Sequence, residues 1–191
     1  MWKPLALILS GILFLLYPAV RPWSDETTVN GAIQAMGSTA WVASHFFAML
    51  GFILVPLGLL ALRNKVPAIL FWIGAGLVLP YYGAEDFGLH AIARNGANVL
   101  ELAHAVRYQP LAVTIFGTGL ILIAAAGVFT AVVVWRDGSL PRLSGILFGL
   151  GFALFLPQFY TPAPVRIAHG ALVAVGCVWL GAALWRNRAR A

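Results

Sequence analysis

Charged residues are scarce in this chain, and their scarcity argues against a soluble fold. Asp, Glu, Lys and Arg together make up 9% of its 191 residues, whereas a soluble domain contains about 25%. Hydrophobic residues make up 61%, which is more apolar surface than the interior of one soluble domain can bury. The composition therefore predicts an integral membrane protein. We interpret the net charge of +6 as a determinant of membrane orientation, and we expect no nucleic-acid partner.

Cysteine and lysine are almost absent, and each scarcity excludes a chemistry. Cys177 is the single cysteine, so the chain forms no intrachain disulfide. Lys3 and Lys65 are the only lysines and both fall outside the apolar runs, which excludes a retinal-type Schiff base within the membrane. In the half of each predicted span nearer the two chain termini, ionisable residues occur only at the ends of the spans. This distribution disfavours a proton-coupled transporter, which needs ionisable groups across the membrane.

Six apolar runs approach the length of about 20 residues that crosses a bilayer. They cover residues 4–20, 39–62, 67–91, 110–135, 143–156 and 164–185. The sequence therefore predicts an all-α fold, a polytopic membrane protein of six transmembrane helices that forms one domain over residues 1–191. Pro56 and Pro80 lie inside the second and third runs and predict kinks there. Ser38 is a candidate N-cap of the second helix. Gly145 and Gly149 form a GxxxG match, which predicts that the fifth helix packs closely against a neighbouring helix.

The basic residues favour an orientation with both termini in the cytoplasm. In that orientation eight basic residues lie inside and four lie outside. Those inside are Lys3, Arg63, Lys65, Arg136, Arg142, Arg186, Arg188 and Arg190, and those outside are Arg21, Arg94, Arg107 and Arg166. We therefore expect the protein in a plasma membrane or a bacterial-type inner membrane, with its polar cluster on the extracytoplasmic side.

Polar residues inside the spans gather toward the predicted outer face. Glu85 and Asp86 lie about 27 Å from the start of the third run, at 1.5 Å per residue, which places them in the outer leaflet. On the same basis His45 and His169 lie about 10 and 8 Å inside the outer ends of their helices, and His90 lies near the outer end of the third. Because charged side chains in a membrane normally face the bundle interior or a wet cavity, we expect these groups to converge on one polar pocket.

Helical spacing separates the two adjacent acids. Tyr82, Asp86 and His90 follow one another at intervals of four residues, so they share one face of a regular helix. Glu85 points about 100° away from Asp86. We therefore expect the two carboxylates to have different partners and different roles.

A divalent metal, most simply zinc, is the first hypothesis for this cluster. The candidate ligands are three imidazoles and one carboxylate from three helices, namely His45, Asp86, His90 and His169. Glu85 would then be the general base of a metal-dependent hydrolase. The substrate would be a lipid or another hydrophobic small molecule that enters from the membrane. Its candidate binding residues are Arg166, Trp41 and Tyr82.

The pair Ser44-His45, together with Asp86, loosely resembles the adiponectin receptor and alkaline ceramidase superfamily. In that superfamily a Ser, an Asp and three His near one membrane face hold zinc in a seven-helix bundle. The resemblance covers only these few residues, and it implies a zinc site near one face of the membrane. This chain departs from the pattern because it has six predicted helices, and because its last helix has His169 alone in place of a paired HxxxH.

Three other functions fit the same residues. Haem b could be held by His45 and His169 as axial ligands, with Arg166 beside a propionate. A metal-free isoprenoid cyclase or isomerase could use Glu85 or Asp86 as a buried acid, with aromatic rings stabilising a cation. The chain could also be a non-catalytic subunit of a larger membrane complex, or a homo-oligomer.

Structural roles for these polar residues predict different contacts. Arg94, Arg107 or Arg166 could pair with the two carboxylates as salt bridges. His45 could donate to a backbone carbonyl instead of binding a ligand.

Overall fold

The protein is an all-helical integral membrane protein. A computed structural model describes residues 2–96 and 98–189, and within these ranges every regular element is a helix. Five helices are long and apolar enough to cross a membrane. They are α1 (Trp2–Val20), α3 (Thr39–Leu59), the continuous run Val66–Asn95 that begins with α4 (Val66–Gly83), α7 (Pro110–Asp137) and α9 (Ala163–Ala189).

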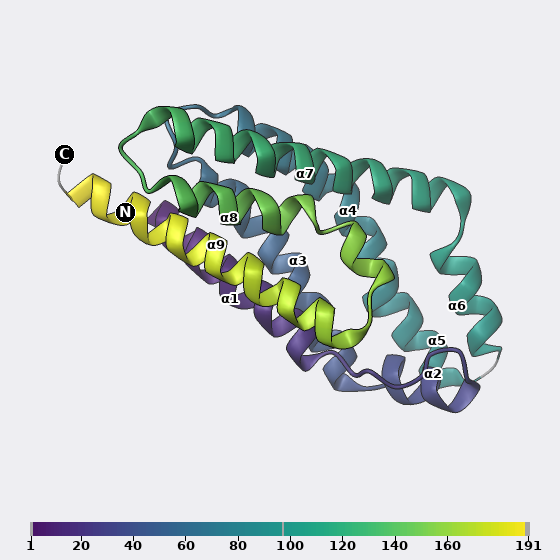
Figure 1. Cartoon of the computed structure of the whole chain (residues 1–191). Helices are drawn as coiled ribbons and strands as arrows, with labels where there is room; N and C mark the ends of the chain where they lie inside the picture. Colours follow the sequence, from purple (N-terminus) through teal and green to yellow (C-terminus); the bar gives the residue numbers. More distant parts are fainter. Residues whose placement is uncertain (1, 97, 190–191) are drawn as a thin grey trace.

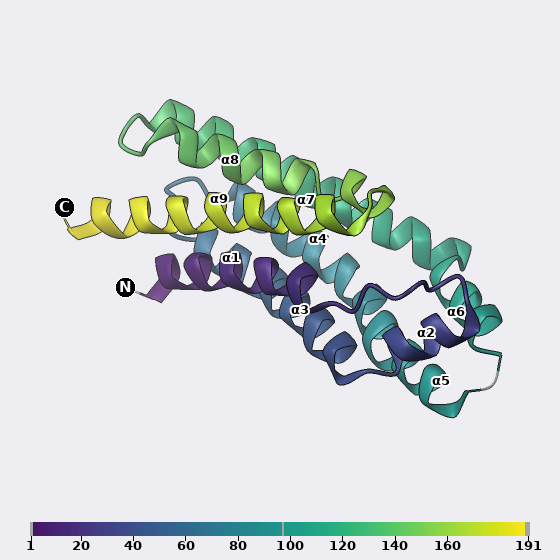
Figure 2. The same ribbon diagram turned by 60° about the horizontal axis from the view of Figure 1, so that its bottom comes forward.

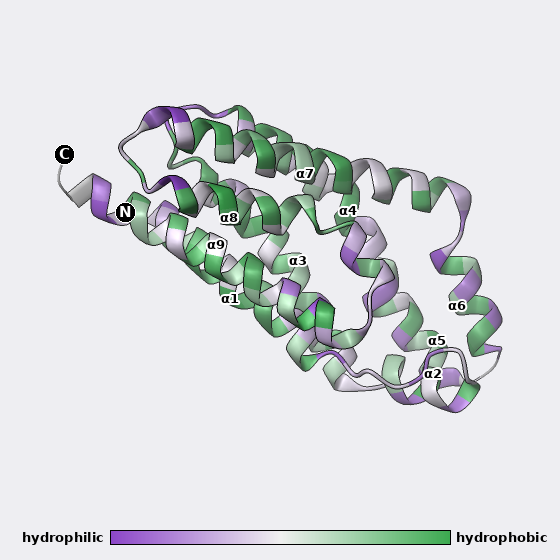
Figure 3. Cartoon of the chain, viewed as in Figure 1, coloured by the Kyte–Doolittle hydropathy of each residue, from purple (hydrophilic) through white to green (hydrophobic). Residues whose placement is uncertain are grey.

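The long helices pack side by side into one bundle, and the two ends of the bundle differ. α1 packs against α3 and α9, α4 packs against α3 and α7, and α8 (Arg142–Ala153) packs against α7 and α9. α1 begins and α9 ends at the same end, which we call the termini end (Figures 1 and 2). Hydrophobic residues cover the long helices, whereas hydrophilic residues gather at the two ends of the bundle (Figure 3).

Three short helices form a cap at the opposite end, which we call the cap end. They are α2 (Val29–Met36), α5 (Leu89–Asn95) and α6 (Val99–Arg107). The cap has its own small hydrophobic core, separate from that of the bundle, made by Ala32, Ala35, Met36, Trp41, Leu89, Ala93, Val99 and Ala103. Trp41, the large aromatic residue of α3 that belongs to this core, is one of the contacts between the cap and the bundle.

The apolar runs predict the helices of the bundle well. Ser38 is the N-cap of α3, because its side chain accepts a hydrogen bond from the backbone N–H of Trp41. The fifth run corresponds to α8, which has 12 residues and is therefore about 18 Å long. A 3₁₀ turn, η2 (Pro157–Tyr160), follows it. Pro56 and Pro80 lie inside α3 and α4, and the kinks expected at them stay predictions.

One turn departs from the regular helix expected over residues 67–91. The π-helical turn η1 (Ala84–Gly88) separates α4 from α5, and the N–H of Leu89 donates to the carbonyl of Ala84, five residues before it. A π-helical turn holds more residues than an α-helical turn, so the residues after it are rotated relative to those before it. Because this turn lies between Tyr82 and His90, the positions of Tyr82, Asp86 and His90 on one face of a regular helix are not those expected from the sequence. Tyr82 and Asp86 are buried, and His90 is half-buried.

The GxxxG match brings α8 close to α7, as expected. A Cβ atom on Gly145 would lie 2.7 Å from the Cβ of Val134, and one on Gly149 would lie 3.0 Å from the carbonyl oxygen of Gly127. Both distances are shorter than atoms tolerate without a shift, so these glycines permit the close contact of the two helices.

Candidate functional site

The Asp86 carboxyl is the most unusual polar group at the cap end. Its residue is fully buried, and neither carboxylate oxygen has a hydrogen-bond partner among the described residues. The hydroxyl of Tyr82, one turn earlier, is also buried and also has no partner within the described ranges. Buried polar groups of native proteins are nearly always paired, so an unpaired one calls for a functional or structural reason. Asp86 is therefore the first candidate for a reactive group.

Glu85, the neighbouring acid, has entirely different surroundings. The Arg107 guanidinium binds it through two hydrogen bonds, from Nε to Oε1 at 2.7 Å and from Nη2 to Oε2 at 3.0 Å. The same Nη2 donates to Glu26 at 2.8 Å, and Glu26 also accepts from Arg21. Two arginines and two glutamates thus alternate in a neutral chain, and each side chain is at most 20% exposed. This ionic network connects the loop after α1, the π-helical turn and the end of α6.

The network shifts the pKa values of its members outside the membrane spans. Burial alone would raise the pKa of Glu26, but the charges of Arg21 and Arg107 outweigh burial and hold this pKa below its usual value. Burial alone would lower the pKa of Arg107, but the carboxylates of Glu85 and Glu26 raise it above its usual value. Both shifts mean that the charged network is favoured in the folded state.

Trp41 lies between the ionic network and the interior of the bundle. Its side chain is completely buried, and its Nε1–H donates to the backbone carbonyl of Glu85 at 2.8 Å. The Arg21 guanidinium lies 4.8 Å from its ring centroid, which is within the range of a cation–π contact. The His45 ring lies 4.3 Å away. Trp41 thereby positions the π-helical turn that carries both acids.

His45 donates to the backbone of its own helix. Its Nδ1 lies 2.8 Å from the carbonyl oxygen of Trp41, and since a carbonyl only accepts, Nδ1 carries the proton. The ring is 3% exposed and has the aromatic rings of Trp41, Tyr17 and Tyr82 around it. The structure therefore contains the bond to a backbone carbonyl that was considered for His45. Its other nitrogen, Nε2, carries no proton in this tautomer.

His90 and His169 bind carbonyls at two other helix ends. Nδ1 of His90 lies 2.8 Å from the oxygen of Met36, the last residue of α2. Nε2 of His169 lies 2.7 Å from the oxygen of Gly151, in the last turn of α8. The last four carbonyls of a helix have no partner within the helix, so each histidine supplies a missing donor. These two bonds fasten α5 to α2 and α9 to α8.

The three histidines among the predicted metal ligands lie in separate surroundings. His90 lies against α2, His169 lies against α8, and His45 lies among the aromatic residues of α1, α3 and α4. Over residues 2–96 and 98–189, no group of three or more His, Cys, Asp or Glu side chains could hold a metal ion. Packed rings also adjoin the two haem candidates, Tyr17 at His45 and Phe155 at His169. Zinc and haem b gain no support from this arrangement and stay predictions from the sequence.

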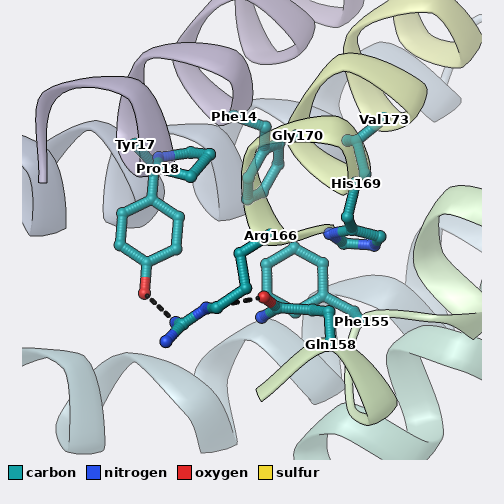
Figure 4. Close-up of a pocket in the computed structure, with 9 residues that line it drawn as sticks. All are labelled: Phe14, Tyr17, Pro18, Phe155, Gln158, Arg166, His169, Gly170 and Val173. Carbon is teal, nitrogen blue, oxygen red and sulfur yellow. Dashed lines mark hydrogen bonds between the residues drawn. The ribbon is translucent and has the colours of Figure 1, made fainter. Parts of the chain in front are cut away.

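Arg166 lines a small notch between α1 and α9 (Figure 4). Its Nε donates to Oε1 of Gln158 at 3.0 Å, and its Nη2 lies 3.5 Å from the Tyr17 hydroxyl. The notch has a volume of about 10 Å³, which is room for about one water molecule. The candidate substrate residues Arg166, Trp41 and Tyr82 are therefore distributed between this notch and the aromatic cluster around His45.

Glu26 and Arg21 are the polar residues that sequence reasoning missed. Both lie near the loop after α1, more than 50 residues before Glu85 and about 80 before Arg107, and no spacing rule connects such distant positions. The pairing of Arg107 with Glu85 agrees with the salt bridge that was considered for Arg107. No protein-family model, no curated protein and no solved structure matches this chain.

Proposed function

We propose that this protein is an intramembrane acid–base enzyme in which Asp86 donates a proton to a hydrophobic substrate, such as an unsaturated isoprenoid. The observation that carries this proposal is the Asp86 carboxyl, which is fully buried and has no hydrogen-bond partner among the described residues. A buried carboxylate without hydrogen bonds is so costly that the group takes up a proton instead. A neutral carboxylic acid is the form that a proton donor requires.

The chemistry needs one carboxyl group and no external reagent. The Asp86 O–H bond breaks as a C–H bond forms at one carbon of a substrate double bond, which leaves a carbocation on the other carbon. The Asp86 carboxylate then takes a proton from a neighbouring carbon, and the electrons of that C–H bond form the new double bond. The product is an isomer of the substrate, and the acid is restored. The rings of Tyr82, Tyr17 and Trp41 pack around His45 near this end of α4, and in this proposal their π faces would stabilise such a cation.

The π-helical turn supports access from the membrane. Phe87 directly follows Asp86, and its side chain is 60% exposed, so this turn reaches the outer surface of the bundle. Irregular π-helical turns within helices frequently occur at functional sites. Glu85 has a positioning role in this proposal, because Arg107 holds its side chain and Trp41 holds its carbonyl.

A hydrophobic carbodiimide tests this proposal without knowledge of the substrate. Such a reagent enters from the bilayer and reacts with protonated carboxyl groups, not with ion-paired carboxylates. In purified protein in lipid nanodiscs, we expect one adduct per chain, located at Asp86 by peptide mass spectrometry. Asp86→Asn should abolish the adduct, and Glu85→Gln should retain it. An unmodified wild-type chain, or an adduct at Glu85, would overturn the proposal in favour of a structural role.

The site faces the extracytoplasmic side in this proposal, and α8 together with η2 makes the sixth crossing. α1 begins and α9 ends at the same end of the bundle, which supports an even number of crossings. The basic residues support cytoplasmic termini. In a Cys177→Ala background, Asn98→Cys should react with an impermeant maleimide in intact cells. Asp137→Cys should react only after the cells are opened. The reverse pattern would place the cap in the cytoplasm.

A further inference from the structure

The ionic network at the cap end leaves one nearby arginine without a counter-charge. Arg21 and Arg107 share the carboxylates of Glu26 and Glu85, so these four charges sum to zero. Arg166 has no carboxylate within 4.0 Å in the part of the chain that the structure describes. Its side chain is half-buried, whereas Arg94, which also has no salt bridge among the described residues, is exposed.

Neutral side chains hold the Arg166 guanidinium in a defined position. Its Cζ lies 5.0 Å from the ring centroid of Trp23 and 5.2 Å from that of Phe159. Gln158, which is 5% exposed, accepts from its Nε at 3.0 Å. The two aromatic contacts and this hydrogen bond hold the guanidinium in place, so a ligand that binds it loses little additional side-chain entropy. Its remaining N–H donors are available to a ligand.

The position of Arg166 in its helix also favours an anion. Arg166 is the fourth residue of α9, which begins at Ala163. The positive end of a helix dipole repels a cation in the first turn, whereas an anion there is stabilised. The Cζ of Arg21 lies 4.6 Å from the centroid of the same Trp23 ring. Because Arg21 is also positively charged, it cannot neutralise Arg166. A negatively charged group beside Arg166 would therefore be attracted by the side chain and by the helix dipole.

The notch next to Arg166 indicates what carries that negative charge. Arg166 and Gln158 lie on one side of the notch, and Phe14, Pro18 and Val173 lie on the other (Figure 4). Tyr17 and His169 also line it. A volume of about 10 Å³ cannot enclose an organic ligand, so the bound group lies at the mouth of the notch. Arg166 lies near the start of a helix that is long and apolar enough to span a membrane, so in a bilayer this notch would open near the level of the lipid phosphates.

We propose that Arg166, held by Gln158 and the rings of Trp23 and Phe159, binds the phosphate of an anionic phospholipid headgroup. Arginine pairs with phosphate through parallel N–H donors, which a neutral surface of the same shape cannot match. The acyl chains would lie against the exposed apolar side chains on the outer surface of α9. This site is independent of Asp86 and does not rest on the proposed enzymatic function.

Native mass spectrometry of the detergent-solubilised chain tests this site with short-chain phosphatidylglycerol as the probe. We expect one retained lipid in the wild-type protein, and a loss of affinity of about tenfold or more in Arg166→Gln, because a hydrogen-bonded charge pair is removed. Arg94→Gln, which removes an exposed arginine elsewhere in the cap, should bind as the wild type does. Equal binding by Arg166→Gln would overturn the proposal.

Two further arms identify the source of the phosphate and check the fold. Inorganic phosphate at millimolar concentration should not displace the lipid, whereas full displacement would contradict a lipid headgroup as the ligand. Added phosphatidylglycerol should raise the thermal midpoint of the wild-type chain but not that of Arg166→Gln. Arg166→Lys, which keeps the charge but not the planar donors, should restore part of this rise. The absence of any restoration, with the fold intact, would contradict a role for the charge.

Discussion

Arg107→Met is expected to destabilise the cap end by about 3 kcal/mol, the lower end of the range for breaking a buried ion pair. The substitution keeps an unbranched side chain of similar length, but it leaves Glu85 without the guanidinium that binds both of its oxygens. It also removes one of the two partners of Glu26. Two partly buried carboxylates then face each other with a single arginine, Arg21. Unfolding in mixed detergent micelles, followed by circular dichroism, measures the loss.

Arg94→Met is the matched control, because Arg94 is exposed and forms no salt bridge among the described residues. A surface substitution of this kind is expected to change the free energy of unfolding by less than about 0.5 kcal/mol. Equal effects of the two substitutions would contradict a stabilising network at the cap end.

The same network makes stability depend on pH. The pKa of Glu26 is lower in the folded state than its ordinary value of 4.5, so its stabilising contribution is fully present above about pH 4.5. The contribution is lost as the pH falls through the lower, folded-state pKa. The wild-type chain should therefore lose stability on acidification below pH 4.5. Arg107→Met should lose less, because it lacks one of the two arginines that lower the pKa of Glu26.

Asp86→Leu is expected to stabilise the chain by about 1–3 kcal/mol, the cost of a buried polar group without a partner. The leucine side chain has a similar branched shape and needs no hydrogen bond. A gain in stability on removal of a functional group is the usual sign of a site that is retained for its activity. Chemical unfolding of the two proteins in the same detergent measures the difference.

Tyr82→Phe serves as a second test of the same reasoning, since the Tyr82 hydroxyl is buried and has no partner within the described ranges. This substitution should also raise the free energy of unfolding, by a smaller amount. A marked loss of stability in Asp86→Leu would show that Asp86 has a structural partner, and would remove the physical basis of its proposed role.

The helices were predictable from the sequence because their signals are local. Apolar runs indicate spans by length alone, Ser38 is recognised by its position before an apolar helix, and Gly145 and Gly149 by their spacing. The amphipathic cap helices are shorter and more polar, so hydropathy did not reveal α2. The π-helical turn was missed because it depends on backbone hydrogen bonds, for which the sequence around Glu85 has no recognised pattern.

The polar site was predictable only in part. Sequence spacing placed the histidines and acids toward one end of the bundle, but which of them meet depends on helix packing. His90 and His169 lie against different helix ends, where each supplies a donor to a terminal carbonyl. Glu26 entered the network from a loop that has no spacing relation to Arg107. Long-range pairs of this kind require the fold itself.

The protonation state of Asp86 in the native protein is the most direct test of the proposed chemistry. Infrared spectroscopy of the protein in lipid at neutral pH detects the carbonyl stretch of a protonated carboxyl, which shifts on exchange into heavy water. We expect this band in the wild-type chain and in Glu85→Gln, and we expect Asp86→Asn to lack it. A wild-type spectrum without the band, or a band that persists in Asp86→Asn, would contradict Asp86 as the buried acid.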